Sequence, residues 1–310
     1  MVQLPQEQAS FGTGLGIVAI IDTGVDTTHP ALTGSLIAGY DFTRNSADTV
    51  SELTDLDQST VVILDQTAVV PLELKVVPVE LSQSTVVILD QSTVVILDND
   101  MFPEAFGHGT MVAGLVHLIA PSAQIMPLKA FHADGSANLS DIVRAIRYAA
   151  DNGASVISMS FDMPVLSPEL QSAVTYAESK GAILVAAAGN EGKSESVYPA
   201  ALSGVIGVGS VNFEDRRSPF SNYGHAARTS APGEALITTF PGNNYAGVWG
   251  TSFSTALVSG AVTLMRQLQP HLHSSDVKDC LDAGVQIDQG MGDGRLDLVR
   301  SLTACAHPDE

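Results

Sequence analysis

Apolar runs rich in β-branched residues alternate with helix-like segments along most of this 310-residue chain. Residues 16–21 form an unbroken apolar run that ends at Asp22, which is typical of a strand buried on both faces. Similar strand-like runs follow at residues 125–130, 155–160, 182–188 and 205–211. Ser140 is the predicted N-cap of a helix that reaches residue 152, and Ser167 followed by Pro168 opens another helix. The alternation predicts an α/β fold with a mostly parallel central sheet and helices on both faces.

The net charge and the lengths of the apolar segments exclude some classes of partner and location for this protein. The chain carries 14 Lys and Arg against 34 Asp and Glu, a net charge of −20. Binding to nucleic acid or to an anionic membrane needs basic patches, so we expect neither partner. The sequence has no uninterrupted run of 18 apolar residues, the length that a membrane-spanning helix needs, so no membrane span is expected. Residues 1–16 lack a basic region followed by an apolar block, and no signal peptide is predicted in this chain.

The two cysteines, Cys280 and Cys305, leave two chemical states open. They cannot supply a four-ligand zinc site alone, and no nearby spacing of His or Cys completes one, so no metal site is predicted. A disulfide between them and a pair of free thiols are both consistent with the sequence. The disulfide would place the protein in an oxidising compartment.

An octapeptide repeat interrupts the α/β pattern. Residues 58–65, 83–90 and 91–98 all read QSTVVILD, and worn copies lie between them. β-branched cores separated by Asp-Gln junctions predict short strands joined by tight turns. We therefore interpret residues 45–100 as a β-rich insertion in a single domain that spans residues 1–310. We expect a small projecting β-meander, with homo-oligomerisation through its open edge as a further hypothesis.

Three short motifs and one asparagine carry residue types that suit nucleophilic catalysis. Asp22 begins Asp-Thr-Gly directly after a strand, His108 lies in Gly-His-Gly-Thr, and Ser252 lies in Gly-Thr-Ser at the start of an apolar helix. Asn190 follows another strand, where a side-chain amide can donate to an oxyanion. Each motif alone has a structural alternative, such as helix capping for Ser252. Pepsin-like enzymes also use Asp-Thr-Gly, but this chain has no second copy of that motif.

Taken together, these motifs resemble the subtilisin-like serine protease family over residues 14–40 and 106–302, with the chain order Asp, His, Ser of that family. The resemblance implies a three-layer subtilisin-like fold and a serine endopeptidase that works through an acyl-enzyme. It makes Asp22, His108 and Ser252 the catalytic triad. It assigns the oxyanion hole to Asn190 and the backbone N–H of Ser252. An esterase or transpeptidase relative, and a binding scaffold whose triad is occluded by the insertion, are the alternatives.

The resemblance also implies where a peptide binds, as an added strand between two segments of the chain. The implied substrate-binding residues are Gly135, Ser136, Ala137, Leu139, Ser160, Phe161, Asp162, Ala187, Gly189 and Val197. A polypeptide is the expected partner, and catalysis needs no cofactor. Structural calcium remains open, although the loop that holds the high-affinity calcium site in the family is missing after His108. The resemblance favours secretion over a cytoplasmic location.

Overall fold

The computed structural model describes residues 10–56, 87–89, 93–95, 102–287 and 290–307. Its centre is a seven-stranded sheet in the order β11-β10-β9-β7-β1-β5-β2. The strands are β1 (Ile17–Asp22), β2 (Tyr40–Asp41), β5 (Gln124–Lys129), β7 (Val156–Met159), β9 (Ile183–Ala187), β10 (Val205–Val211) and β11 (Thr229–Pro232). All neighbouring strands run parallel. The predicted parallel sheet is confirmed, because β-branched runs buried on both faces suit this arrangement.

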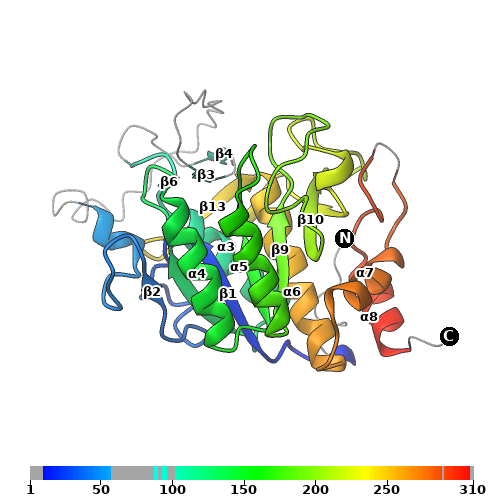
Figure 1. The fold of residues 1–310 in the computed structure, drawn as a ribbon, viewed down its shortest axis with the longest axis horizontal. Helices are drawn as coiled ribbons and strands as arrows, with labels where there is room; N and C mark the ends of the chain where they lie inside the picture. Colours follow the sequence, from blue (N-terminus) through cyan, green and yellow to red (C-terminus); the bar gives the residue numbers. More distant parts are fainter. Residues whose placement is uncertain (1–9, 57–86, 90–92, 96–101, 288–289, 308–310) are drawn as a thin grey trace.

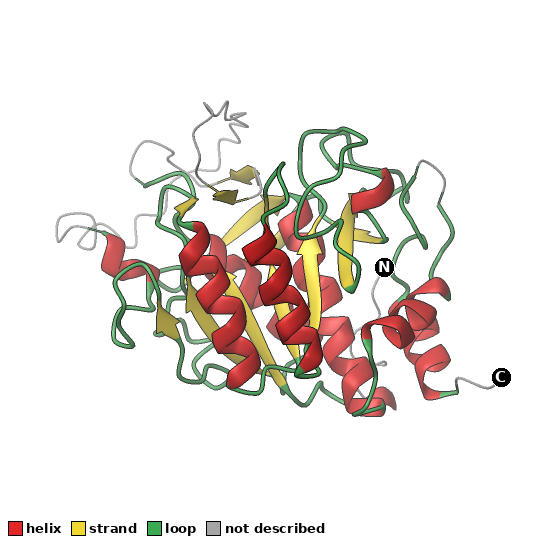
Figure 2. Ribbon diagram, viewed as in Figure 1, coloured by secondary structure: helices red, strands yellow, loops and turns green. Residues whose placement is uncertain are grey.

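Helices cover both faces of the sheet (Figure 1, Figure 2). Alternate residues of β1 point to opposite sides, as the two-residue period of a strand requires. Ala19 and Ile21 pack in a core with α4 (Leu139–Asp151) and α5 (Pro168–Ser179). Val18 and Ile20 pack in a second core with α3 (His108–Ile119) and α6 (Thr251–Leu268). The result is the three-layer arrangement that the sequence predicted.

The two predicted helix starts differ in outcome. The side chain of Ser167 accepts hydrogen bonds from the N–H groups of Glu169 and Leu170, at 3.1 and 3.3 Å, as expected for an N-cap before Pro168. The prediction of Ser140 as an N-cap is wrong, because α4 begins at Leu139 and Asn138 is its cap residue. Leu139 packs against the core, which draws the helix start upstream of the polar serine.

Short strands form two further sheets at the edge of the domain. One has the order β12-β13-β4, with β12 (Leu236–Phe240), β13 (Asn244–Trp249) and β4 (Thr93–Val95). The other has the order β6-β3-β8, with β6 (Ser136–Ala137), β3 (Val87–Leu89) and β8 (Phe161–Asp162). β3 and β4 belong to two neighbouring octapeptides, yet each pairs with strands of a different sheet. Most of the predicted β-rich insertion, including its first octapeptide at residues 58–65, lies outside the described residues. The two segments that are described extend two separate sheets beside the domain.

The remaining elements complete the periphery. Short 3₁₀ helices span Glu52–Asp55 and Gly224–Ala226, and the C-terminal helices are α7 (Ser274–Asp282) and α8 (Leu298–Ala306). Cys280 of α7 and Cys305 of α8 form a disulfide, with Cα atoms 5.2 Å apart. This resolves the choice that the sequence left open. The bond joins α7 to α8, and α8 packs against α6 near the end of the chain (Figure 1).

Replacement of both Cys280 and Cys305 by Ser is expected to lower the free energy of unfolding by about 3–4 kcal/mol. The cross-link spans 25 positions, and closing a loop of that size in the unfolded chain has an entropic effect of this magnitude. Denaturant unfolding with and without reductant measures the loss, and reduction of the unmodified protein should reproduce it. Equal stability of the oxidised protein and the double variant would contradict a stabilising role.

Candidate active site

The carboxyl ends of three adjacent parallel strands bring candidate residues to one edge of the sheet. Asp22 is the last residue of β1, Ser160 directly follows β7, and Asn190 lies just beyond β9. β7 lies between β1 and β9 in the sheet, so these three positions are close in space. Ligand sites of open α/β sheets occupy this edge. Two helices on one face, α3 and α6, add His108 and Ser252 from their first turns.

Asp22 holds the imidazole of His108 in one orientation. Nδ1 of His108 lies 2.8 and 3.0 Å from the two carboxylate oxygens of Asp22. Both side chains are buried, with 0% and 3% of the residue surface exposed. An ionised carboxylate only accepts hydrogen bonds, so the ring proton is on Nδ1 and the lone pair of the neutral ring is on Nε2. His108 is thus prepared to accept a proton at Nε2.

The glycines around His108 allow this close approach. Gly109 packs so tightly that an added Cβ would lie 2.0 Å from the carbonyl oxygen of Gly24 and 3.1 Å from Cβ of Asp22. Gly107 has a φ of 88°, a left-handed conformation that favours glycine. Any larger residue at 109 would push the start of α3 away from the end of β1. The Gly-His-Gly sequence is therefore a requirement of the Asp22–His108 contact.

Ser252 is the second residue of α6. Phe253, the following residue, packs against the ring of His108 with centroids 5.6 Å apart. The hydroxyl of Ser252 donates to the carbonyl oxygen of Ser160 at 3.4 Å, and Nε2 of His108 has no hydrogen-bond partner within the described chain. Proton transfer to His108 requires the hydroxyl to turn from Ser160 towards Nε2. The start of a helix favours developing negative charge at this serine.

Asn190 is fixed beside the same helix start. Its Oδ1 accepts a hydrogen bond from the N–H of Thr251 at 3.0 Å. With the oxygen held in this way, the Nδ2 end of the amide is the end that can donate to an oxyanion. Asn190 and the N-terminal turn of α6 are therefore adjacent.

The residues expected to bind substrate belong to several elements at and beyond the edge of the sheet. Ser136 and Ala137 form β6 after Gly135, and Phe161 and Asp162 form β8 directly after Ser160. Ala187 ends β9, and Gly189 follows with a φ of 98°. Among the other two residues, Leu139 is partly buried and Val197 is buried in the core that contains α4 and α5. Of the whole set, Ser160 is in direct contact with Ser252, since its carbonyl oxygen accepts a hydrogen bond from the Ser252 hydroxyl.

Glu52 is a buried acid behind the Asp22–His108 pair that the sequence did not single out. Its carboxylate accepts hydrogen bonds from the hydroxyls of Thr23 and Thr110 and from the N–H groups of Gly109 and Thr110, the last two at 3.0 and 3.3 Å. These donors are the neighbours of Asp22 in the chain and the first turn of α3. Glu52 thus joins the end of β1 to the start of α3. The sequence offers little sign of this role, because Glu52 is one acid in the polar stretch of residues 45–56, which belongs to the predicted insertion.

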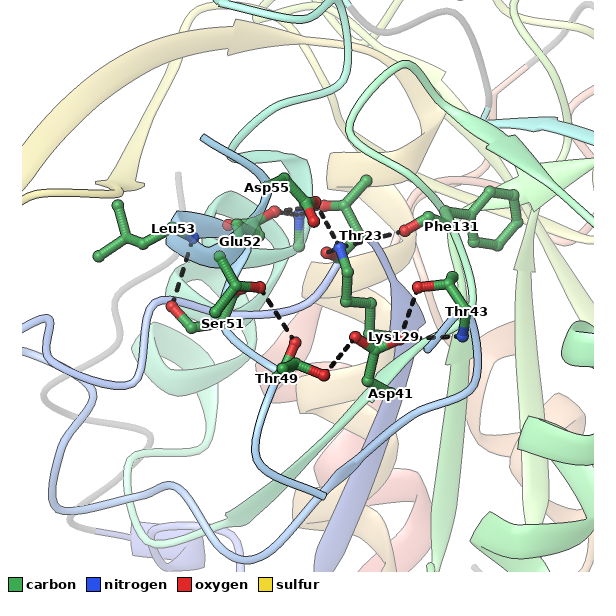
Figure 3. Close-up of polar contacts among 12 residues, drawn as sticks. Thr23, Asp41, Thr43, Thr49, Ser51, Glu52, Leu53, Asp55, Lys129 and Phe131 are labelled. Atoms are coloured by element: carbon green, nitrogen blue, oxygen red, sulfur yellow. Dashed lines mark hydrogen bonds and ion pairs between the residues drawn. The ribbon is translucent and has the colours of Figure 1, made fainter. Parts of the chain in front are cut away.

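A buried lysine supports the same joint (Figure 3). The ammonium of Lys129, at the end of β5, donates to the carbonyl oxygens of Thr23 and Phe131 and pairs with Asp55 at 2.6 Å. Its side chain is fully buried, and a buried charge is tolerated when all its donors have partners. Asp55 belongs to the same 3₁₀ helix as Glu52. The beginning of the predicted insertion therefore packs beneath the site.

Burial raises the pKa of Glu52 from 4.5 to about 7, and the negative charge of nearby Asp22 adds to this effect, against hydrogen bonds from Thr110 and Thr23 that lower it. The folded protein therefore keeps the proton over a range in which the unfolded chain has lost it. Stability from this group is complete below pH 4.5 and is lost as the pH rises to about 7. A shift of this size corresponds to about 3 kcal/mol.

Glu52→Gln is expected to flatten the fall in unfolding free energy between pH 4.5 and about 7, because the amide does not titrate. Denaturant unfolding across this range, in a Ser252→Ala background that prevents self-digestion, measures the slope. Glu214→Gln is the matched control, since the Glu214 side chain is 65% exposed and should leave the profile unchanged. Parallel profiles for the unmodified protein and Glu52→Gln would contradict the shift.

Metal-binding groups and cavities can mark a second site, and one cavity of this structure lies away from the Asp22–His108 pair. Among the described residues, no group of three or more His, Cys, Asp and Glu side chains could hold a metal ion. α3 runs from His108 to Ile119 and turns at Ala120 without an intervening loop. A cavity of about 430 Å³ lies between α5 and α7, lined by residues such as Glu178, His273 and Lys278. It adjoins Ile183, at the start of β9, and so lies away from the carboxyl ends that carry Asp22 and Asn190.

Solved structures with the same fold include two proteases. Fervidolysin from Fervidobacterium pennivorans, described as a keratinolytic enzyme related to subtilisin, superposes with a TM-score of 0.74 and 24% identity, over 97% of this chain and 44% of that chain. A lanthipeptide protease superposes with a TM-score of 0.72 and 21% identity, over 96% of this chain and 90% of the other. At these identities the likeness establishes the three-layer fold.

Sequence relatives and a family profile give the assignment. A thermophilic serine proteinase from Bacillus sp. (strain AK1) is 35% identical over 258 residues, 80% of this chain and 51% of that protein. The chain therefore spans about half the length of that relative. Thermitase from Thermoactinomyces vulgaris is 32% identical over 275 residues, 85% of this chain and 79% of that protein. The profile of the subtilase family matches residues 15–289, and the chain belongs to the subtilase family.

Proposed function

We propose that this subtilase is a serine endopeptidase in which Ser252 attacks the peptide carbonyl, His108 is the general base and Asp22 orients it. The observation that carries the proposal is the contact of 2.8 Å between Asp22 and Nδ1 of His108, beside a serine at a helix start. A serine hydroxyl is a weak nucleophile until a neutral imidazole removes its proton. The Asp22 contact keeps the acceptor lone pair at Nε2 and stabilises the imidazolium formed in the reaction.

The reaction then uses the same groups twice. Ser252 forms a tetrahedral intermediate and then an ester with the acyl half of the substrate, while His108 donates its proton to the leaving amine. Water attacks the ester with His108 again as base, and the acid leaves. Asn190 and the backbone N–H of Ser252 stabilise the oxyanion in both steps. A hydrogen bond from the N–H of Thr251 to Oδ1 of Asn190 supports this role. Because the oxygen of the amide faces Thr251, Nδ2 is the atom of the side chain that donates to the oxyanion.

We further infer that a polypeptide substrate binds as an extended strand between β6 and β8. β8 directly follows Ser160, whose carbonyl oxygen contacts Ser252, and β6 is the opposite edge strand of the same small sheet. Main-chain pairing of this kind recognises a peptide rather than a small ester, which favours peptidase activity over the esterase alternative. Ala187, Gly189 and Val197 then lie near the side chain that precedes the cleaved bond.

The Cys280–Cys305 disulfide supports a secreted location, since such bonds persist in oxidising compartments. No helix within the described ranges is long and apolar enough to cross a membrane. The net charge of −20 disfavours nucleic acid and anionic membranes as partners.

A fluorophosphonate probe is expected to form one adduct, located at Ser252, and Ser252→Ala should abolish both the adduct and casein hydrolysis. Ser254→Ala is the matched control, because Oγ of Ser254 already donates to the carbonyl oxygens of Ala231 and Pro232, at 3.0 and 3.1 Å. That variant should keep the adduct. Peptide mass spectrometry locates it, and an adduct on Ser254 would refute the assignment.

Asn190→Ala is expected to lower kcat by about 10²–10³ with little change in KM, the loss typical of removing one oxyanion donor. Asn190→Asp separates two roles, since it keeps an acceptor for the Thr251 N–H but has no amide donor. It should lose at least as much kcat. Steady-state kinetics with a chromogenic peptide measures both values. A large rise in KM with kcat intact would mean that Asn190 binds the ground state.

A further inference from the structure

One strand of the octapeptide repeat lies between the two segments that we assign to substrate binding. β3 pairs antiparallel with β6, through Val87 with Ala137 and Ile88 with Ser136. On its other side β3 pairs antiparallel with β8, through Ile88 with Asp162 and Leu89 with Phe161. β3 is thus the central strand of this small sheet. It occupies the place where an extended substrate would add its own backbone.

The direction of β3 leads towards the proposed nucleophile. As the chain advances from Ile88 to Leu89, its partner on β8 moves back from Asp162 to Phe161. The residue before Phe161 is Ser160, whose carbonyl oxygen accepts a hydrogen bond from the hydroxyl of Ser252. β3 therefore runs towards Ser252 as the acyl half of a substrate must.

The following strand, β4, pairs with the strand that precedes Ser252 in the chain. β4 pairs antiparallel with β13, and Thr93 lies opposite Trp249, three residues before Ser252 in the chain. Figure 1 shows β3 and β4 together above the carboxyl ends of the central strands. Two consecutive strands of the repeat thus pair with the chain on both sides of the site.

The burial of the reactive groups agrees with an occupied cleft. Ser252 has 0% of its surface exposed, and His108 has 3%. Nε2 of His108 is buried and has no hydrogen-bond partner in the described part of the chain. A substrate carbonyl has to come within about 3–3.5 Å of the attacking oxygen. Both reactive groups are covered, so a substrate can reach Ser252 only after the covering chain has moved.

We propose that β3 is a built-in competitive inhibitor, which occupies the substrate edge between β6 and β8 and has to leave before a polypeptide can bind. The inference rests on the proposed peptidase function and adds its regulation. The contact is short, with two residue pairs on each side, so a substrate strand of greater length can displace it. A tethered strand still competes well, because its effective concentration is in the millimolar range.

The test compares two replacements of equal length by Gly/Ser linkers, one of residues 83–98 and one of residues 58–73. Both remove a QSTVVILD copy and the octapeptide after it, but only the first removes β3.

If β3 fills the edge in about nine molecules of ten, its removal should lower KM for a chromogenic peptide about tenfold. The rate of fluorophosphonate labelling should rise by a similar factor. kcat should stay within about twofold, since a competitive occupant is absent at saturation. Intact mass confirms that the compared chains are uncut.

Point variants give a second measurement that does not depend on the linkers. Ile88→Pro removes an N–H from β3, and Ile63→Pro makes the same change in an identical octapeptide. We expect the lower KM and faster labelling for Ile88→Pro alone. Equal KM and labelling rates for the unmodified protein, the 83–98 replacement and Ile88→Pro, with all three active, would overturn this inference alone. If all three failed to label and to cleave peptide, the proposed function would fall with it.

Discussion

The joint between the end of β1 and the start of α3 is the constraint on which the rest of the site depends. It brings Asp22 and His108, 86 positions apart in the chain, to a distance of 2.8 Å. Hydrogen bonds weaken steeply with distance and angle, so a small shift of either element would lose the contact. Gly109 sets the closest approach of the two backbones, and Glu52 holds both sides through its four donors. The chemistry that we propose at Ser252 therefore depends on the packing behind Asp22 and His108.

The same joint concentrates buried charge, which explains why it needs so many polar partners. Asp22, Glu52 and Lys129 are all fully buried, and Asp55 pairs with the lysine. Each would be costly alone, but in this network the carboxylates accept from backbone and hydroxyl donors and the ammonium donates to two carbonyls and one acid. Glu52 goes further and retains its proton to about pH 7, which limits the negative charge next to Asp22. A hydrophobic core could be as stable, but it would not fix the imidazole.

The sequence predicted those parts of the molecule whose signal is local. The β-branched runs around residues 16–21 and 205–211 became β1 and β10 because burial on both faces selects such residues. The chain order of three motifs located the candidate site. Glu52 could not be found in this way, because its importance comes from donors that belong to β1 and α3. The helix start at Ser140 was misplaced for a related reason, since packing of Leu139 outweighed a favourable cap.

The repeat shows this limit most clearly. Residues 83–90 and 91–98 are identical, yet β3 covers the fifth to seventh residues of one copy and β4 the third to fifth of the other. Their pairing partners, not their sequences, decide the difference. A strand edge recognises mainly backbone donors and acceptors, so any uncharged, β-branched segment of sufficient length can pair with it. A peptidase that binds substrates through such edges is open to occupation by strands of its own chain. A tether makes that occupation persistent, and the few residues in the ladder keep it reversible.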